Sequence, residues 1–221
     1  MASGPTRFVV AVDGPAASGK GVIAARLGEA YGLPVLDTGL LYRAVADAVA
    51  DAGGDLDDEA LCATVARGLD FTGLESPRLR SRAAGEAASR VAVHPAVRAI
   101  LVDFQRAFAN RESGSVIDGR DIGTVIAPWA PAKLYVTASA GARADRRWRQ
   151  LQSEGETLTY EAIRADIEAR DQRDAARAAS PMRPAADAVL LDTTDLDIDR
   201  AFDAARRIVE IARARWSQAN G

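Results

Sequence analysis

The sequence predicts an α/β fold with a mostly parallel five-stranded sheet flanked by helices. Short apolar runs typical of buried strands alternate along the chain with longer segments of helical periodicity. A glycine-rich loop joins the first of these runs to the first helix. The chain of 221 residues is long enough to bury a real core, and we expect one 221-residue domain built mainly on Ala, Val, Leu and Ile, because only 5% of residues are aromatic.

The expected strands are short apolar runs, at residues 8–13, 34–37, 115–118, 133–137 and 189–192. The expected helices have apolar residues at helical spacing, over residues 22–31, 40–52, 95–109, 139–154, 159–179 and 198–216. Between residues 61 and 92, helix-prone stretches interrupted by glycine and proline predict an insertion without clear strands. Parallel sheets bind ligands outside the carboxyl ends of their strands, so we expect the motifs that follow the strands to converge there.

The loop after the first strand fits the spacing of a phosphate-binding loop. The expected donor-nucleotide residues are Gly14, Pro15, Ala16, Ala17, Ser18, Gly19, Lys20, Gly21 and Val22. Backbone N–H groups and the start of the following helix would hold phosphates, and the Lys20 ammonium would meet the outer ones. Gly21 and Val22 have no hydroxyl where such loops usually offer Ser or Thr to Mg²⁺. A glycine-rich turn with a chance lysine is the alternative.

A second group of polar residues follows the second expected strand. It comprises Asp37, Thr38, Tyr42 and Arg43. Arg43 could hold a phosphate through two hydrogen bonds, and Tyr42 could pack against a ribose or base. The alternative is an ordinary helix cap with Tyr42 in the core.

A third group ends the strand at residues 115–118, with Asp118, Arg120 and Asp121 around a glycine. Asp118 stands where an acidic residue would hold Mg²⁺ through water, and Arg120 would meet the transferred phosphate. A tight turn with a surface salt bridge is the alternative.

Arginines are concentrated in residues 143–180. Arg170, Arg173, Asp174 and Arg177 share one helical face, whose excess positive charge favours an anionic ligand over a network of exposed salt bridges. The arginines at 143, 146, 147 and 149 suit a lid or an ordinary surface equally well.

Composition excludes several classes of protein. The net charge of −3 gives no overall field for nucleic acid, and no apolar run approaches the roughly 20 residues of a membrane span. Cys62 is the sole cysteine, so no disulfide can form within the chain. We expect a cytoplasmic monomer that binds neither nucleic acid nor membranes.

Six segments in this order are similar to bacterial cytidylate kinases, a group of nucleoside monophosphate kinases. They are GPAASGKG, LDTGLLYR, HPAVR…QRAFA, VIDGRDIGTVI, RDQRDAARAASP and DAVLLDTT. The fourth and fifth, VIDGRDIGTVI and RDQRDAARAASP, discriminate best, since phosphate-binding loops occur in many unrelated proteins, so the resemblance rests on the acceptor side. The resemblance implies transfer of the γ-phosphoryl group of ATP to CMP or dCMP, with Mg²⁺, on a P-loop kinase core.

The resemblance also implies roles for individual residues. Cytosine would be read by Ser89, Arg98 and Asp121. The pentose would be held by Arg170 and Asp174, and the acceptor phosphate by Arg43, Arg120 and Arg177. Thr38 and Tyr42 match flanking contacts, Lys20, Asp118, Arg120 and Arg177 would act on the transferred group, and Asp37 and Asp118 would serve Mg²⁺.

The resemblance further implies an acceptor-binding insertion over residues 43–98 and a lid over 143–180. The insertion looks shorter than is usual in the family and without its small antiparallel sheet. Two alternatives are another small P-loop kinase, acting on UMP, AMP or a metabolite such as shikimate, and a nucleotide-binding switch or ATPase module.

Overall fold

The computed structural model describes residues 7–74, 76–176 and 180–220. Its strands are β1 (Val9–Asp13), β2 (Val35–Asp37), β3 (Ser115–Gly119), β4 (Ala132–Thr137) and β5 (Val189–Asp192). Its longer helices are α1 (Lys20–Tyr31), α2 (Thr38–Asp51), α3 (Glu59–Gly68), α5 (Arg82–Val91), α6 (Pro95–Ala109), α7 (Ala140–Ser153), α8 (Tyr160–Ala175) and α9 (Ile198–Asn220). Two short elements complete the set, the helix α4 (Pro77–Arg80) and the π-helical turn η1 (Ile122–Ile126).

The strands form one sheet in the order β2-β3-β1-β4-β5, and the pairs β1–β3, β1–β4 and β4–β5 are parallel. This confirms the predicted α/β class and the five-stranded sheet. The central strand β1 is buried along its whole length, as its run of apolar residues requires. The register pairs Asp13, the last residue of β1, with Gly119, the last of β3, and with Tyr135 on β4, so β1 and β3 end level while β4 continues to Thr137.

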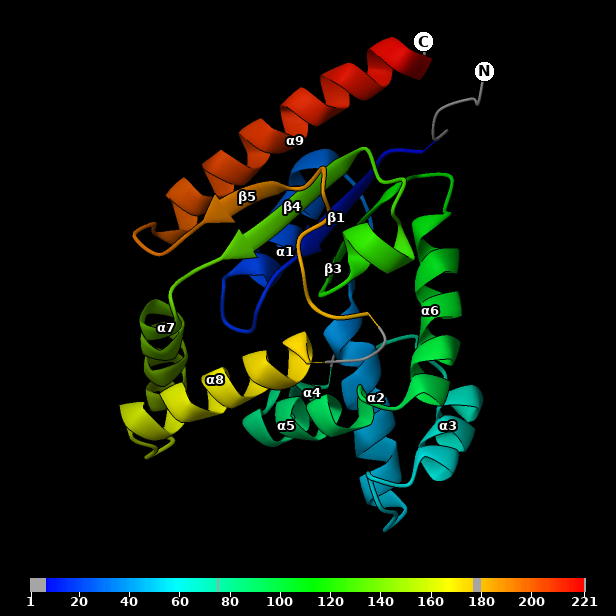
Figure 1. Cartoon of the computed structure of the whole chain (residues 1–221), viewed down its shortest axis with the longest axis vertical. Helices are drawn as coiled ribbons and strands as arrows, with labels where there is room; N and C mark the ends of the chain where they lie inside the picture. The colour runs from blue at the N-terminus through cyan, green and yellow to red at the C-terminus, as the bar shows by residue number, and fades with distance from the viewer. Residues whose placement is uncertain (1–6, 75, 177–179, 221) are drawn as a thin grey trace. The chain divides into compact units, whose positions relative to one another are not determined.

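The chain divides into two compact units, residues 1–35 with 109–221, and residues 36–108. In the first unit, α1 and α9 cover one face of the sheet (Figure 1). Their side chains Ile23, Leu27 and Val209 pack with Val10 and Leu134 of the strands, all buried. Burial of this aliphatic surface is the main stabilising force of the unit.

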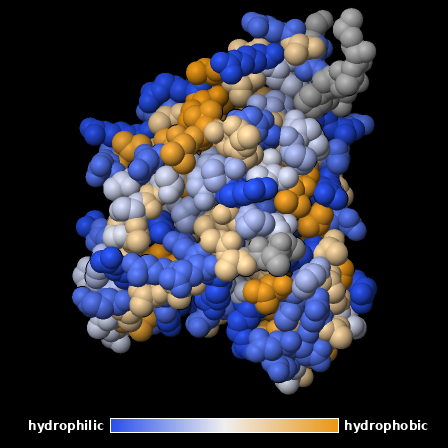
Figure 2. Space-filling view, viewed as in Figure 1, coloured by the Kyte–Doolittle hydropathy of each residue, from blue (hydrophilic) through white to orange (hydrophobic). Residues whose placement is uncertain are grey.

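The outer strand β5 of this unit is only partly covered. Val189 and Leu190 are 47% and 63% exposed, and Ile198 and Ile211 of α9 are also exposed. Hydrophobic residues accordingly gather over β5 and α9 in the space-filling view (Figure 2).

Helices α7 and α8 of the first unit pack against each other through a small core of their own. Its buried members are Ala144, Leu151, Ile163 and Ile167. Trp148 packs against this core from α7, and Ala17 of the phosphate-binding loop packs against it as well. The expected helix over 159–179 ends at Ala175 among the described residues.

The second unit contains helices α2 to α6, and its described residues form no strand beyond the end of β2. Its core is contributed by α2, α3, α5 and α6, and includes Leu41, Val45, Cys62, Val91 and Leu101. The residues expected to form the acceptor-binding insertion, 43–98, lie within this unit. No helix among the residues described in either unit is long and apolar enough to cross a bilayer.

Candidate functional site

The phosphate-binding loop runs from the end of β1 to the start of α1 in an irregular backbone conformation. Gly14 has φ 148° and Gly19 has φ 88°, and Ala17 adopts a left-handed φ of 59°. A Cβ atom on Gly14 would collide with the carbonyl oxygen of Val136, so only glycine fits there. Such a loop directs successive N–H groups toward an anion, and α1 adds its positive N-terminal end.

Lys20 lies at the first position of α1, with its ammonium 3.5 Å from Oδ1 of Asp118. Both side chains are largely buried. A Cβ on Gly21 would lie only 3.2 Å from Oδ2 of Asp118, so a small residue here leaves room for that carboxylate. The structure thus brings together two of the predicted catalytic residues, Lys20 and Asp118.

The backbone of the phosphate-binding loop is supported by a residue that follows the edge strand β5. Thr193, just after β5, has its hydroxyl 3.0 Å from the carbonyl oxygens of Ser18 and Thr137. Arg146 of α7 donates to the hydroxyl and the carbonyl oxygen of Thr193. Thr193, the first residue after β5, therefore supports the backbone of the loop.

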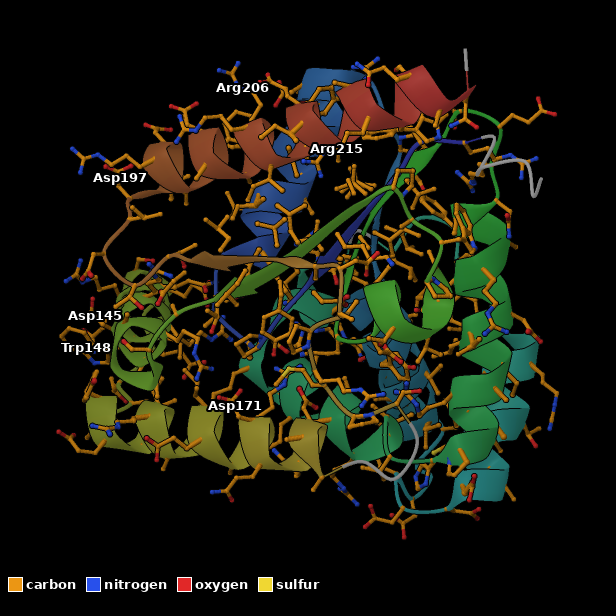
Figure 3. The ribbon with its side chains drawn as sticks, turned by 45° about the horizontal axis from the view of Figure 1, so that its top comes forward. Asp145, Trp148, Asp171, Asp197, Arg206 and Arg215 are labelled. Carbon is orange, nitrogen blue, oxygen red and sulfur yellow. The ribbon has the colours of Figure 1, made fainter. Side chains whose placement is uncertain are left out.

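Arg143 of α7 supports the same loop from the helical side. Its guanidinium is buried and donates to the carbonyl oxygens of Ala16 (3.2 Å) and Ala138 (2.9 Å). It also makes two hydrogen bonds, of 3.1 and 2.6 Å, to the carboxylate of Asp171 on α8. Asp171 is labelled on α8 in Figure 3. Arg143 thus connects the loop to both helices.

The other two arginines of this group lie at the surface. Arg147 donates to Gln150, and Arg149 forms an exposed ion pair with Asp145 one turn earlier. Asp145 and Trp148 are labelled on α7 in Figure 3. The structure therefore separates Arg143 and Arg146, which support the loop, from Arg147 and Arg149, which do not, a distinction that sequence spacing did not make.

On the acceptor side of the first unit, Arg120 donates from Nε to Oδ2 of Asp174 at 3.0 Å. Asp174 is 1% exposed and Arg120 also donates to the carbonyl oxygen of Gly119. Two residues predicted to bind the acceptor nucleotide are thus joined directly. Arg170 is one helical turn earlier on α8, and Arg177 lies outside the described residues.

Asp121 is buried and precedes η1. The turn itself is held by Asp13, whose carboxylate accepts hydrogen bonds from the N–H groups of Ile122 and Gly123, both at 2.8 Å. Burial raises the pKa of Asp13 to about 7, against the two N–H bonds that lower it, while the charges of Asp121 and Asp118 add to the increase. Asp13 was not among the predicted site residues; the signal that could have identified it is a carboxylate at the end of an otherwise apolar strand.

In the second unit, the predicted acceptor residues lie on three helices. Thr38, Tyr42 and Arg43 are on α2, Ser89 is on α5 and Arg98 is on α6. Arg98 is buried, donates to the Tyr42 hydroxyl at 3.3 Å and lies 6.0 Å from the centre of its ring. Thus Tyr42 does pack within the unit, as the alternative interpretation held, but it does so against a predicted ligand residue.

Arg43 and Asp37 have partners within the second unit. Arg43 donates to the carbonyl oxygen of Leu79 at 2.6 Å. Asp37 caps α2 by accepting the N–H of Gly39 at 2.9 Å, so one of its oxygens has a structural role.

Ser89 is 2% exposed, and its hydroxyl has no hydrogen-bond partner among the residues that the structure describes. A buried hydroxyl without a partner carries a desolvation cost, which a ligand group could remove.

Comparison with known proteins decides the family. A family model described as cytidylate kinase matches residues 10–212. The chain belongs to the cytidylate kinase family. This confirms the resemblance that the motifs indicated, and with it the prediction of a nucleotide-dependent kinase.

Curated members of the cytidylate kinase family are similar over nearly their whole length. A cytidylate kinase of Caulobacter sp. (strain K31) is 64% identical over 214 residues, which is 97% of this chain and 99% of that one. A cytidylate kinase of Methylocella silvestris is 56% identical over 93% of this chain and 95% of the relative. Among solved structures, an uncharacterized protein from Eubacterium ventriosum aligns with a TM-score of 0.52 at 15% identity, covering 92% of this chain and 99% of that one, a likeness of fold alone.

Proposed function

We propose that this protein transfers the γ-phosphoryl group of ATP to CMP or dCMP, forming ADP and CDP or dCDP. The observation that carries the proposal is the family match over residues 10–212, because this range includes both the phosphate-binding loop and every acceptor motif. Kinases of this family use ATP, and the loop from Gly14 to Lys20 is the group of residues suited to its phosphates.

In the proposed reaction, an oxygen of the acceptor phosphate attacks the γ-phosphorus of ATP. The bond from that phosphorus to the β–γ bridging oxygen breaks, so ADP leaves and the nucleoside diphosphate forms. Lys20 would neutralise charge on the donor phosphates, and Arg120 would meet the group in transit. Positioning and charge neutralisation supply the rate, and the protein forms no covalent bond to the substrate.

The acceptor residues proposed for the cytosine suit its chemistry. Its N4 amino group is a donor that the Asp121 carboxylate can accept, and its O2 and N3 are acceptors for an arginine such as Arg98. The hydroxyl of Ser89, which has no hydrogen-bond partner among the described residues, can both donate and accept. These roles would explain why such polar groups are buried in both units.

Mg²⁺ is proposed as the metal that accompanies ATP. The described residues contain no group of three or more metal-binding side chains, which fits an ion held mainly by phosphates and water. Asp118 is the carboxylate best suited to contribute, since it lies beside Lys20 and Gly21. The second candidate ligand for Mg²⁺ is Asp37, through the carboxylate oxygen that does not cap α2. Bound Mg²⁺ would neutralise charge on the phosphates.

An acceptor screen tests the proposal. ADP release would be measured with ATP and, separately, CMP, dCMP, UMP, AMP and shikimate. We expect CMP or dCMP to give the highest kcat/KM, with the matching diphosphate identified by chromatography. Preference for another acceptor would establish the rival kinase activity, and ATP hydrolysis unaffected by any acceptor would favour a switch or ATPase.

A further inference from the structure

Asp13 is as buried as its neighbours on β1 but is the charged residue among them. It ends a strand that is otherwise apolar, it is 3% exposed, and it carries a carboxylate. The next residue is Gly14, the first of the phosphate-binding loop. Burial of a carboxylate is costly unless hydrogen bonds compensate it, so a specific partner is expected.

The partner is the backbone of η1. The two carboxylate oxygens of Asp13 accept separate hydrogen bonds, Oδ1 from the N–H of Ile122 and Oδ2 from that of Gly123. These N–H groups are 109 and 110 residues away in sequence and directly follow Arg120 and Asp121. The contact therefore fixes the backbone immediately beyond two proposed acceptor residues.

Gly123 allows this contact because it has no side chain. A Cβ atom there would lie 3.2 Å from Cδ of Lys133 and 3.3 Å from Oδ2 of Asp13, tighter than ordinary packing. The absence of a side chain thus allows the turn to approach the carboxylate. Within the turn, the N–H of Val125 bonds to the carbonyl oxygen of Asp121 at 2.8 Å, so η1 and Asp121 are one hydrogen-bonded unit.

We infer that Asp13 is a positioning residue for the acceptor nucleotide, which it orients by clamping the segment 119–127 rather than by touching substrate. The inference rests on the proposed function, since it concerns the CMP residues Arg120 and Asp121. Asp13 immediately precedes the donor loop in the sequence, but its carboxylate is bound to the acceptor segment, so its effect is expected there. Residues that act through hydrogen bonds to a ligand-binding group commonly matter nearly as much as that group.

The test uses two variants that disturb the hydrogen bonds between Asp13 and η1, one at the carboxylate and one at the turn. Asp13→Asn keeps the volume but has only one acceptor oxygen, so its amide must face one of the two N–H donors. Gly123→Ala keeps the carboxylate and crowds the turn. The matched control is Asp70→Asn, which alters an exposed carboxylate that holds the N–H of Thr72 in a loop of the second unit.

Titration calorimetry with CMP, and separately with a nonhydrolysable ATP analogue, would be done at pH 8, above the pKa of about 7 for Asp13. We expect Asp13→Asn and Gly123→Ala each to bind CMP about tenfold more weakly, as for loss of one hydrogen bond to a charged group. Their affinity for the ATP analogue should not change. The control Asp70→Asn should bind both ligands as the wild type does. A rise in KM for CMP greater than any fall in kcat should accompany the weaker CMP binding of the two variants.

Retained CMP affinity in folded Asp13→Asn, or equal losses for CMP and the ATP analogue, would overturn the inference and leave Asp13 a purely structural residue. If Asp13→Asn does not fold, as judged by circular dichroism, Gly123→Ala decides by the same criteria. The titration of the wild-type protein distinguishes failure of this inference from failure of the proposed function. If the wild type does not bind CMP, the proposed function itself is contradicted.

Discussion

Arg120 and Asp174 form an ion pair with an Nε to Oδ2 distance of 3.0 Å, joining the end of β3 to α8 across 54 residues of sequence. The side chains are 15% and 1% exposed. Arg120, which the family resemblance implies for the acceptor phosphate, and Asp174, which it implies for the pentose, are therefore held relative to each other by a direct contact.

Asp174→Asn should destabilise the protein markedly. The substitution leaves the Arg120 guanidinium largely buried without its carboxylate, which costs on the order of 3 kcal/mol in the free energy of unfolding. Glu168→Gln on the same helix is the matched control, because it breaks an exposed pair with Arg164 and should cost less than about 0.5 kcal/mol. Urea denaturation measures both, and equal effects would show that the buried pair contributes little.

Ser89→Ala should weaken CMP binding without lowering the stability of the protein. Its hydroxyl is buried without a partner among the described residues, so its removal should leave the free energy of unfolding unchanged or slightly raised. Affinity for CMP should fall by about fivefold, the worth of one neutral hydrogen bond. Thermal unfolding and calorimetry on one preparation provide both values. Unaltered CMP affinity would remove Ser89 from the proposed site.

Arg143→Lys should loosen the phosphate-binding loop although the charge is kept. An ammonium cannot reproduce the paired hydrogen bonds to Asp171 together with those to the carbonyl oxygens of Ala16 and Ala138. We expect about 3 kcal/mol lower unfolding free energy and weaker binding of the ATP analogue. Arg149→Lys, at an exposed pair with Asp145, serves as control and should behave as wild type.

Val22→Thr should lower the Mg²⁺ concentration needed for half-maximal activity. Val22 is 47% exposed at the position two after Lys20, so a hydroxyl can be added there without disturbing the core. Val22→Ala, which shortens the side chain without adding a ligand, should leave the requirement unchanged. A Mg²⁺ titration at fixed ATP compares the variants, and identical curves for Thr and Val would show that the hydroxyl has no access to the metal.

The stability of the protein should carry a pH dependence that originates at Asp13. Its pKa is raised from 3.8 to about 7, so between these values the native state binds a proton that the unfolded state has released. The stabilisation by the protonated form is complete below about pH 4 and is lost as the pH rises through 7. Asp118, Asp121 and Tyr135 are the charged or titratable neighbours of this group.

The measurement is the free energy of unfolding of wild type minus that of Asp13→Asn from pH 4 to 8. We expect this difference to fall by up to about 4 kcal/mol with increasing pH, since each unit of pKa shift corresponds to about 1.4 kcal/mol. A difference that is flat, or that rises with pH, would contradict a raised pKa at this site.

Local patterns predicted the elements well. The strand expected at residues 133–137 is observed at Ala132–Thr137, and the helix expected at 139–154 is Ala140–Ser153, because periodicity and N-cap residues act over a few positions. The start of α2 at Thr38 rather than residue 40 follows from the cap by Asp37. The π-helical turn at Ile122–Ile126 was missed, since it depends on the distant carboxylate of Asp13.

Sequence alone determined the α/β class, the phosphate-binding loop and the family, because these depend on residue types at short, regular spacings. Tertiary structure decided which of the many arginines are buried, which carboxylates they meet and which strand end holds the acceptor turn. Arg143 reaches a carbonyl oxygen 127 residues away, and no local pattern encodes such a pairing. The reason is physical: a buried charge is tolerated only where folding brings a complementary partner within hydrogen-bond distance.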